Sequence, residues 1–290
     1  MDKILILRYQ NIITGNLFSE SISKDINLSE SNALINAIKR QDEFRHYKSE
    51  YKFIFSKEDN DGCFGILLKK GTANVGTSYN SKGVVKEKIN DWHGLPFYIY
   101  YKTQLIFIQE IKKLIKVDTL CRLLSNIDLK EQSTNNYKTV VEPIIEPGNF
   151  WPIVNNADGI CELKVELAGP NLFGATKKAN VLLKELKEVY NQEKFTFKLE
   201  NENAKLNIPN NEFINSCLDQ AESGGGSWEL LALFRKKKTR VKSYDKAATM
   251  SVETIENIET LQSLKSRLIE KVKQIDDLLL KNLNKTQNRD

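Results

Sequence analysis

Seven lysine and arginine residues gather in one short segment of this 290-residue chain, the basic arm at residues 235–246. A single acidic residue, Asp245, accompanies them, so the basic arm carries a formal charge of +6. The whole chain holds 43 basic and 38 acidic residues, which leaves 36 and 37 outside the arm. Because the rest of the chain is nearly neutral, this concentration predicts a polyanionic partner such as the phosphate backbone of DNA. The alternative is a solvated hairpin end whose charges serve solubility.

The residues predicted to contact DNA are cations that neutralise phosphates without reading bases. The chain shows no recognition helix or RNA-binding aromatic motif, so we expect binding that is largely tolerant of sequence. Two further lysine pairs, one at a predicted strand end and one at a predicted helix start, are expected to join the same surface. The predicted set is Arg235, Lys236, Lys237, Lys238, Arg240, Lys242, Lys69, Lys70, Lys177 and Lys178.

Three consecutive glycines, Gly224–Gly226, precede the basic arm and raise the question of a nucleotide-binding loop. A strand at Trp228–Phe234 is expected to follow them, whereas a phosphate loop leads into the N-terminus of a helix. Gly169 and Gly174 have the Walker spacing, but Ala175 stands where the lysine belongs. We therefore expect Gly224–Gly226 to serve backbone geometry. Both faces of the following strand are mostly apolar, which predicts an internal position in its sheet.

A second pattern is typical of catalysis. Glu162-Leu163-Lys164 lies on a predicted strand, with Asp158 upstream. It resembles the E-x-K element of PD-(D/E)xK nucleases, in which carboxylates hold Mg²⁺ and the lysine steadies the charged transition state. The alternative is an amphipathic strand that spells E-x-K by coincidence, and no proline–aspartate pair accompanies it. A Mg²⁺-dependent nuclease that uses Glu162 and Lys164 is the second hypothesis.

Other metal and cofactor sites find little support in the sequence. The histidines His46 and His93 are far apart and no C-x-x-C pair is present, whereas a zinc site needs several such ligands at fixed spacing. The stretch from Lys57 to Leu68 resembles part of a calcium loop, but its first and last positions lack the required acids. We expect a hairpin turn there, and a protein with no catalytic residues, metal or cofactor.

The elements that must position these residues form an α+β pattern, with hairpin-rich mixed or antiparallel sheets, packed helices and a long C-terminal helix. An N-terminal α+β domain is expected at residues 1–130. It holds a first strand, a helix at about 29–45, hairpins within 51–71 and 95–109, and a helix at about 110–125.

A polar stretch without periodicity, at residues 130–137, is the predicted domain boundary. The second α+β domain, residues 131–250, begins with loop-rich strand and continues into a cleanly alternating strand at 160–167. A helix at about 173–191, further strands and a short helix lead to the glycines. The basic arm closes this domain.

The third predicted unit, residues 251–290, is an amphipathic helix from about 252 to 284. Its apolar residues recur near the coiled-coil period, which allows packing on its own domain or pairing with a second copy. The second possibility predicts a homodimer that doubles the phosphate contacts. A third hypothesis is a protein-interaction module that docks a partner through this helix. The apolar positions are 258, 261, 264, 268, 272, 275, 278, 279 and 283.

The chain is not expected to insert into a membrane. No stretch approaches the ~18 apolar residues of a membrane span, and the start MDKILILRYQNIITG lacks the features of a secretory signal. The four cysteines are widely scattered, and a chain of this size does not need disulfides. We therefore expect a cytoplasmic protein.

The order of several short stretches resembles the RexA-like phage exclusion proteins carried by prophages. The resemblance spans roughly residues 45–285. It implies a dimeric α+β DNA-binding protein without catalysis, which acts in abortive infection, an antiviral phage defence, beside a membrane effector protein. The stretches are the hairpin YKFIFSKEDNDGCFGILLKKG, a basic linker, the hairpin HGLPFYIYYKTQLIFIQ, V-x-E-P at Val140–Pro143, the strand ELKVEL and the long charged C-terminal helix.

Overall fold

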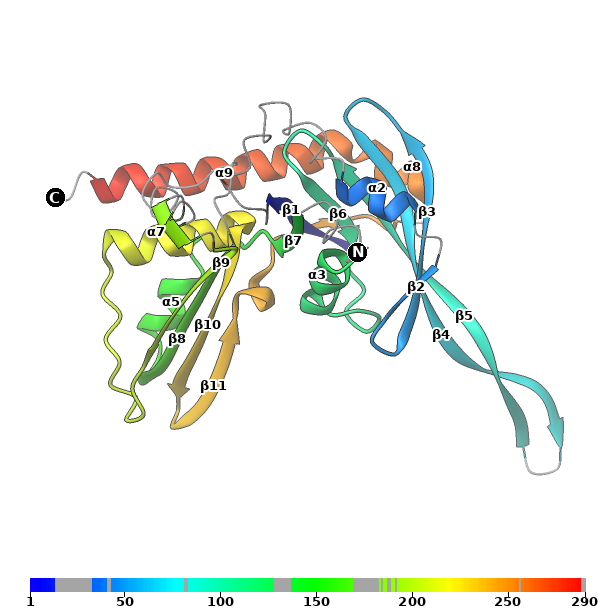
Figure 1. Cartoon of the computed structure of the whole chain (residues 1–290). Coiled ribbons are helices and arrows are strands. Elements are labelled where there is room, and N and C mark those ends of the chain that lie inside the picture. Colours follow the sequence, from blue (N-terminus) through cyan, green and yellow to red (C-terminus); the bar gives the residue numbers. More distant parts are fainter. Residues whose placement is uncertain are drawn as a thin grey trace.

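The computed structural model describes residues 1–13, 33–40, 43–80, 83–127, 137–168, 183, 185, 186, 189, 190, 192–255 and 257–287, with the side chains of 73–90 and 279–287 left aside. The fold is α+β, as predicted, with two antiparallel sheets and helices packed against them (Figure 1). The first sheet has eight strands and curls into a half-barrel, and the second is a four-stranded sheet.

The first sheet collects strands from distant parts of the chain. Its order is β12-β1-β6-β5-β4-β3-β2, and β7 pairs with the second half of β1. Because β7 and β12 lie beyond residue 130, the chain returns to this sheet twice after its N-terminal part. The strands are β1 (Asp2–Ile13), β2 (Glu43–His46), β3 (Ser49–Glu58), β4 (Gly62–Asn80), β5 (Gly83–Tyr100), β6 (Leu105–Gln109), β7 (Tyr137–Pro143) and β12 (Thr249–Val252).

Strand β1 is buried on both faces, because the sheet has helices on both sides. Leu5 and Leu7 join a core that includes residues of α2 (Ala33–Arg40) and α3 (Val117–Ser125). Ile6, which points the other way, joins a separate core with residues of the C-terminal helices. The continuous apolar run at the start of the chain follows from this two-sided burial.

The two hairpins predicted for the N-terminal part are confirmed as β3–β4 and β5–β6. In the β3–β4 turn, Asp59 Oδ1 accepts the backbone N–H groups of Asp61 at 2.8 Å and Gly62 at 2.9 Å, so the calcium-like stretch is a hairpin turn. The sequence did not reveal the length of β4 and β5, which have 19 and 18 residues. Their outer parts pair with each other and, within the described residues, with no further strand, as a ribbon that projects from the body (Figure 1).

Two predicted helices are shorter than expected. The prediction at 29–45 corresponds to α2, because residues 43–46 pair with β3 as strand β2. The prediction at 110–125 corresponds to α3, which begins only at Val117, after a turn in which Ile111 O accepts the N–H of Leu114 at 2.8 Å. Most of the helix predicted at 173–191 lies outside the described residues.

The second sheet carries the predicted DNA-binding segment and has the order β11-β10-β8-β9. Trp228 of β10 is buried against Phe150, with the ring centroids 5.2 Å apart, in a core closed by two helices. Strand β10 lies between β8 and β11, which confirms the internal position predicted from its two apolar faces. The elements are α5 (Phe150–Asn155), β8 (Gly159–Ala168), β9 (Lys194–Glu200), α7 (Glu212–Gln220), β10 (Gly226–Phe234) and β11 (Lys237–Lys242).

The three glycines make a close turn between α7 and β10, as expected. Gly224 has a φ of 85°, which favours glycine. A side chain on Gly226 would collide with the backbone oxygen of Glu166. The turn also lies against β1, where buried Arg8 donates from Nη1 to Ser223 O at 2.6 Å. The glycines therefore join the second sheet to the first.

Glu222, in the same turn, makes the stability of the fold depend on pH. Burial, reinforced by the charge of Asp219, raises the pKa of Glu222 to about 8. The folded protein then keeps a proton that the unfolded chain releases above pH ~4.5. This contribution to stability is complete at low pH and disappears as the pH rises through about 8.

We therefore expect Glu222→Gln to match the wild type near pH 5 and to exceed its free energy of unfolding by about 2–4 kcal/mol at pH 8.5. Urea denaturation at several pH values measures this difference. The exposed Glu253→Gln is the control and should leave the pH profile unchanged. Parallel profiles for Glu222→Gln and the wild type would show that the burial of Glu222 does not govern pH stability.

The C-terminal segment forms two helices, α8 (Ile258–Ser263) and α9 (Lys265–Gln287), where one helix from about 252 was predicted. The predicted start is wrong because residues 249–252 pair with β1 as β12. Up to Ile275 the apolar residues of the stripe pack in their own chain, all of them buried except the half-buried Leu264, so packing in cis is confirmed for this part. In the described part of the chain, no helix is long and apolar enough to cross a membrane.

Candidate nucleic-acid interface

The basic arm begins in a tight hairpin that joins β10 to β11. Phe234 pairs with Lys237, so only Arg235 and Lys236 form the connection. Their φ angles are 49° and 65°, the left-handed conformation that two-residue hairpin turns require. Glycine and asparagine usually occupy such positions, which is why the sequence did not mark this turn. Asp158 supports the loop, since its Oδ2 accepts the backbone N–H of Lys236 at 3.4 Å.

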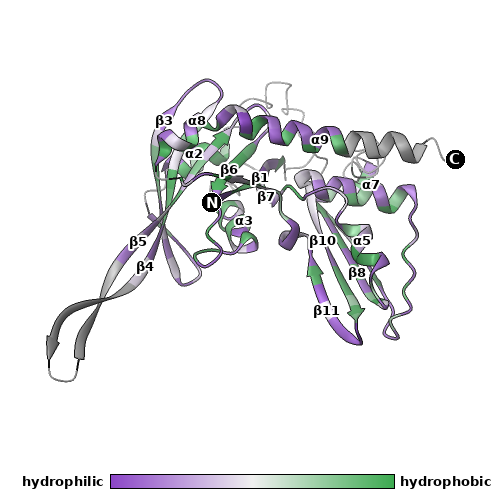
Figure 2. Ribbon diagram, turned by 180° about the vertical axis from the view of Figure 1, so that it is seen from behind, coloured by the Kyte–Doolittle hydropathy of each residue, from purple (hydrophilic) through white to green (hydrophobic). Residues whose placement is uncertain are grey.

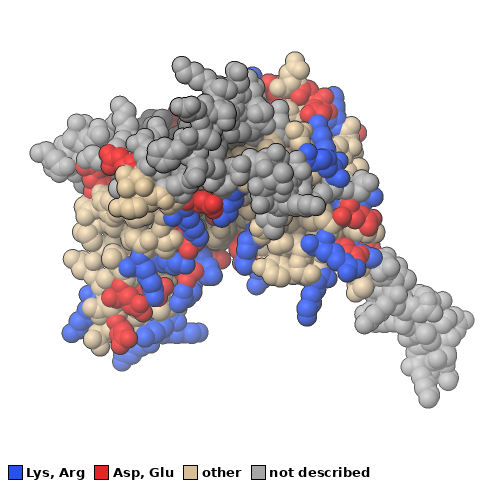
Figure 3. Space-filling view, viewed as in Figure 1, with Lys and Arg blue, Asp and Glu red and all other residues tan. Residues whose placement is uncertain are grey.

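We call residues Arg235–Lys238 the hairpin tip. All four side chains are exposed, and within the described part of the chain none of them forms an ion pair with a carboxylate. Figure 2 shows the β10–β11 hairpin passing from hydrophobic strand to hydrophilic end. In Figure 3, blue lysine and arginine side chains gather at the lower end of the second sheet. Four adjacent positive charges therefore stand on a hairpin fixed to a packed sheet.

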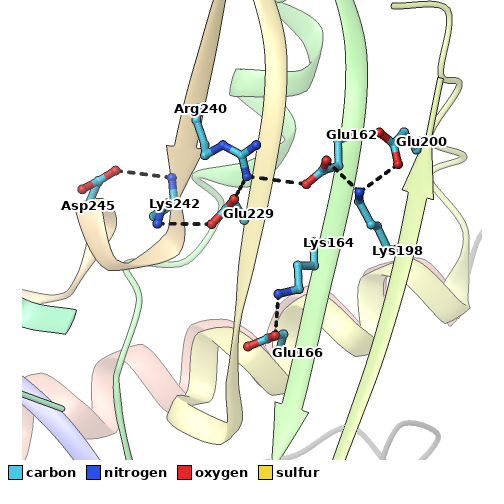
Figure 4. Close-up of polar contacts among 9 residues, drawn as sticks. All are labelled: Glu162, Lys164, Glu166, Lys198, Glu200, Glu229, Arg240, Lys242 and Asp245. Carbon is cyan, nitrogen blue, oxygen red and sulfur yellow. Dashed lines mark hydrogen bonds and ion pairs between the residues drawn. The ribbon is translucent and has the colours of Figure 1, made fainter. Parts of the chain in front are cut away.

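The remaining cations of the basic arm behave differently. Arg240 forms ion pairs with Glu229 and, at 3.6 Å, with Glu162 (Figure 4). Lys242 Nζ lies 3.3 Å from Glu229 Oε2. The structure thus divides the predicted DNA-contacting cations of the arm into the four of the hairpin tip and two that are ion-paired within the sheet, while the seventh cation of the arm, Lys246, lies beyond β11. The carboxylates responsible lie on β8 and β10, which the linear charge count could not connect with β11.

The two charged residues of the proposed nuclease pattern also form ion pairs, Glu162 within the network of Arg240 and Lys164 in a separate pair. Glu162 also lies 3.1 Å from Lys198 Nζ, and Lys164 Nζ lies 2.6 Å from Glu166 (Figure 4). Both charged groups of the E-x-K pattern therefore have partners on the sheet face. Among the described residues, no group of three His, Cys, Asp or Glu side chains is arranged to hold a metal ion.

Two of the other predicted lysines, Lys69 and Lys70, lie in the first sheet and not at the hairpin tip. Both belong to β4, where Lys69 Nζ donates to Leu114 O at 2.5 Å. Lys70 Nζ lies 2.6 Å from Glu50 and 5.9 Å from the centroid of the Trp92 ring. Lys177 and Lys178 fall outside the described residues. A DNA contact by these four lysines stays a prediction.

A polar cleft of about 320 Å³, which the sequence did not indicate, lies between α3 and the second sheet. Its lining includes Arg122 of α3 and Lys242 of β11, and it contains equal numbers of basic and acidic side chains. Burial raises the pKa of Glu142 in this cleft to about 7, although the Tyr244 hydroxyl donates to its carboxylate at 2.6 Å. Because acidic side chains share its lining, the cleft is a poorer phosphate site than the hairpin tip.

The four cysteines, Cys63, Cys121, Cys161 and Cys217, are all buried free thiols. Burial raises the pKa of Cys63 to about 11 and that of Cys217 to about 12, so neither thiol is activated as a nucleophile.

Comparison with known proteins does not assign the chain to a family. No protein-family model matches the chain, and no match was found among curated proteins.

Proposed function

We propose that this protein is a non-enzymatic, largely sequence-tolerant DNA-binding protein that contacts the phosphate backbone through its hairpin tip. The observation that carries the proposal is the set of four adjacent, exposed cations at Arg235–Lys238, whose side chains form no ion pair among the described residues. The carboxylate of Asp158 accepts only the backbone N–H of Lys236. A short hairpin presents these charges, so they favour phosphate contacts over a helix-borne reading of bases. The packed core beneath β10 supports the tip, because it reduces the entropy lost when the cations bind.

Fluorescence anisotropy with short labelled duplexes tests the proposal. We expect two duplexes of unrelated sequence to bind with affinities within a few-fold of each other at low salt, and both affinities to fall steeply as salt rises. No binding at 50 mM salt, or binding of one sequence alone, would contradict the proposal. The protein-interaction hypothesis predicts that no DNA binding is seen even at low salt.

The nuclease hypothesis predicts a different result for the same protein. With Mg²⁺ or Mn²⁺ present, plasmid DNA would be cut, and Glu162→Ala would abolish the cleavage. Since Glu162 and Lys164 are engaged in ion pairs on the sheet face, no feature of the geometry favours this second function. Intact plasmid is therefore the expected outcome.

The proposed biological role is phage exclusion in the cytoplasm, by abortive infection beside a membrane effector protein. It rests on the resemblance to RexA-like proteins and on the cationic tip, which gives such a protein a means of holding DNA. Plaque counts on cells that express the wild type or a tip-neutralised variant test the role. Equal plaque numbers on both strains would show that phage exclusion does not require DNA binding through the hairpin tip.

A further inference from the structure

Strand β9 is an open edge of the second sheet. It pairs with β8 on one side, and no strand in the described part of the chain pairs with its other side. The backbone N–H of Trp228 donates to Ser243 Oγ, toward β11, so the backbone groups of Glu229 point toward β8. Lys164 of β8 is paired with Glu229, so its backbone groups point toward β10, and those of the next residue, Val165, point toward Phe197 of β9. Because successive residues of a strand point their backbone groups to opposite sides, those of Thr196 and Lys198 point away from β8. Within the described residues no strand pairs with these groups, which leaves them to a further strand.

The opposite edge of the sheet is protected from such pairing. Strand β11 has the sequence KKTRVK, so antiparallel pairing with a second copy of itself would place cations opposite cations. Edge strands that carry lysine and arginine resist addition of another strand. Strand β9 also carries two lysines, but its sequence KFTFKLE includes Glu200, so two antiparallel copies can place opposite charges together.

The sequence of β9 is complementary to itself when two copies run antiparallel about Phe197. Lys194 then lies opposite Glu200 of the partner subunit, and Phe195 lies opposite Leu199 of the partner subunit. Thr196 lies opposite Lys198 of the partner subunit, and the two copies of Phe197 face each other. Every position therefore meets a residue of opposite charge or like polarity, without a like-charge pair.

Apolar surface accompanies this edge. Leu199 is 37% exposed, and Phe213, at the start of α7, is 46% exposed. Phe213 lies against Phe197, with ring centroids 5.7 Å apart, and Phe197 lies 6.1 Å from Phe195. A second β9 strand would cover part of this row, so pairing would bury apolar surface in addition to forming backbone hydrogen bonds.

We propose that two copies of the chain form a homodimer through β9, as one continuous antiparallel sheet of eight strands with a twofold axis at Phe197. The self-complementary register identifies the partner as a second copy. The C-terminal helix, in contrast, has most of its described apolar stripe buried in its own chain. Such a dimer carries two hairpin tips, but its formation does not depend on DNA binding.

Size-exclusion chromatography with light scattering tests the association. We expect the wild type at twice the chain mass of 33.3 kDa. Thr196→Pro removes an outward N–H, a change that an edge strand tolerates, and should halve the mass. Thr196→Ala keeps the N–H and should remain a dimer. A monomeric wild type, or a dimeric Thr196→Pro protein, would overturn the proposal.

Cysteine cross-linking tests the register and remains decisive if Thr196→Pro fails to fold. Phe197→Cys places two thiols opposite each other at the twofold axis, in a non-hydrogen-bonded pair, where side chains approach most closely. Mild oxidation should convert most of this variant to a covalent dimer on a non-reducing gel. Thr196→Cys, opposite Lys198 of the partner subunit, should stay uncross-linked. Absence of cross-linking at Phe197, or equal cross-linking at both positions, would refute this interface.

Discussion

Neutralising the hairpin tip is expected to weaken binding to duplex DNA at least tenfold. The variant changes Arg235, Lys236, Lys237 and Lys238 to glutamine and removes four charges that have no carboxylate partner among the described residues. Each lost phosphate contact gives up the favourable release of condensed counterions. Arg240 and Lys242 stay unchanged, because Glu229 already balances part of their charge. Fluorescence anisotropy at fixed low salt measures the loss.

A matched control separates the tip from the effect of net charge. Four exposed cations away from the second sheet, namely Lys48, Lys57, Arg267 and Lys273, are changed to glutamine in a second variant. Both variants lose four positive charges, but the control should weaken binding less than about threefold if phosphates contact the tip. Equal losses in the two variants would show that the tip is not the DNA-binding surface.

Removing the carboxylate of Asp276 is expected to lower the free energy of unfolding by about 3 kcal/mol. Asp276 Oδ2 lies 3.3 Å from Nη2 of Arg8, whose side chain is fully buried in β1. Burial lowers the pKa of Arg8, and Asp276 opposes that effect. Asp276→Ala therefore removes a carboxylate that pairs with the buried guanidinium, at the point where β1, the glycine turn and α9 meet.

Asp277→Ala is the natural control for this prediction, because the neighbouring carboxylate on α9 is exposed. Its effect on stability should stay within about 0.5 kcal/mol. Urea denaturation gives both values, provided that the free energy of unfolding falls with urea concentration at the same slope in each protein. If the two alanine variants unfold at the same urea concentration, the Arg8–Asp276 pair does not stabilise the junction between the sheets.

Features with a local cause could be predicted from the sequence. The α+β class, the two hairpins, the internal position of β10 and the geometric role of Gly224–Gly226 all follow from alternation of apolar residues and from turn residues. Each depends on a few neighbouring positions, where side-chain period and glycine conformation determine the outcome.

Features that depend on distant partners could not be predicted. Arg240 finds Glu162 across two strand pairings, so no linear charge count separates it from Lys238. The turn at Arg235–Lys236 uses residues that rarely adopt positive φ, and nothing in the sequence marks it. The C-terminal helices begin at Ile258 and not at about 252, because Val252 still pairs with β1 at the end of β12, and this long-range pairing is not visible in the local sequence.

The slope of DNA affinity against salt concentration, compared between the wild type and the tip-neutralised variant, tests the central claim most directly. Each phosphate neutralised on duplex DNA adds about 0.9 to the slope of log K against log salt. If all four tip cations contact phosphates, the variant should have a slope shallower than that of the wild type by about 3–4. Identical slopes in the two proteins would contradict DNA binding through the hairpin tip.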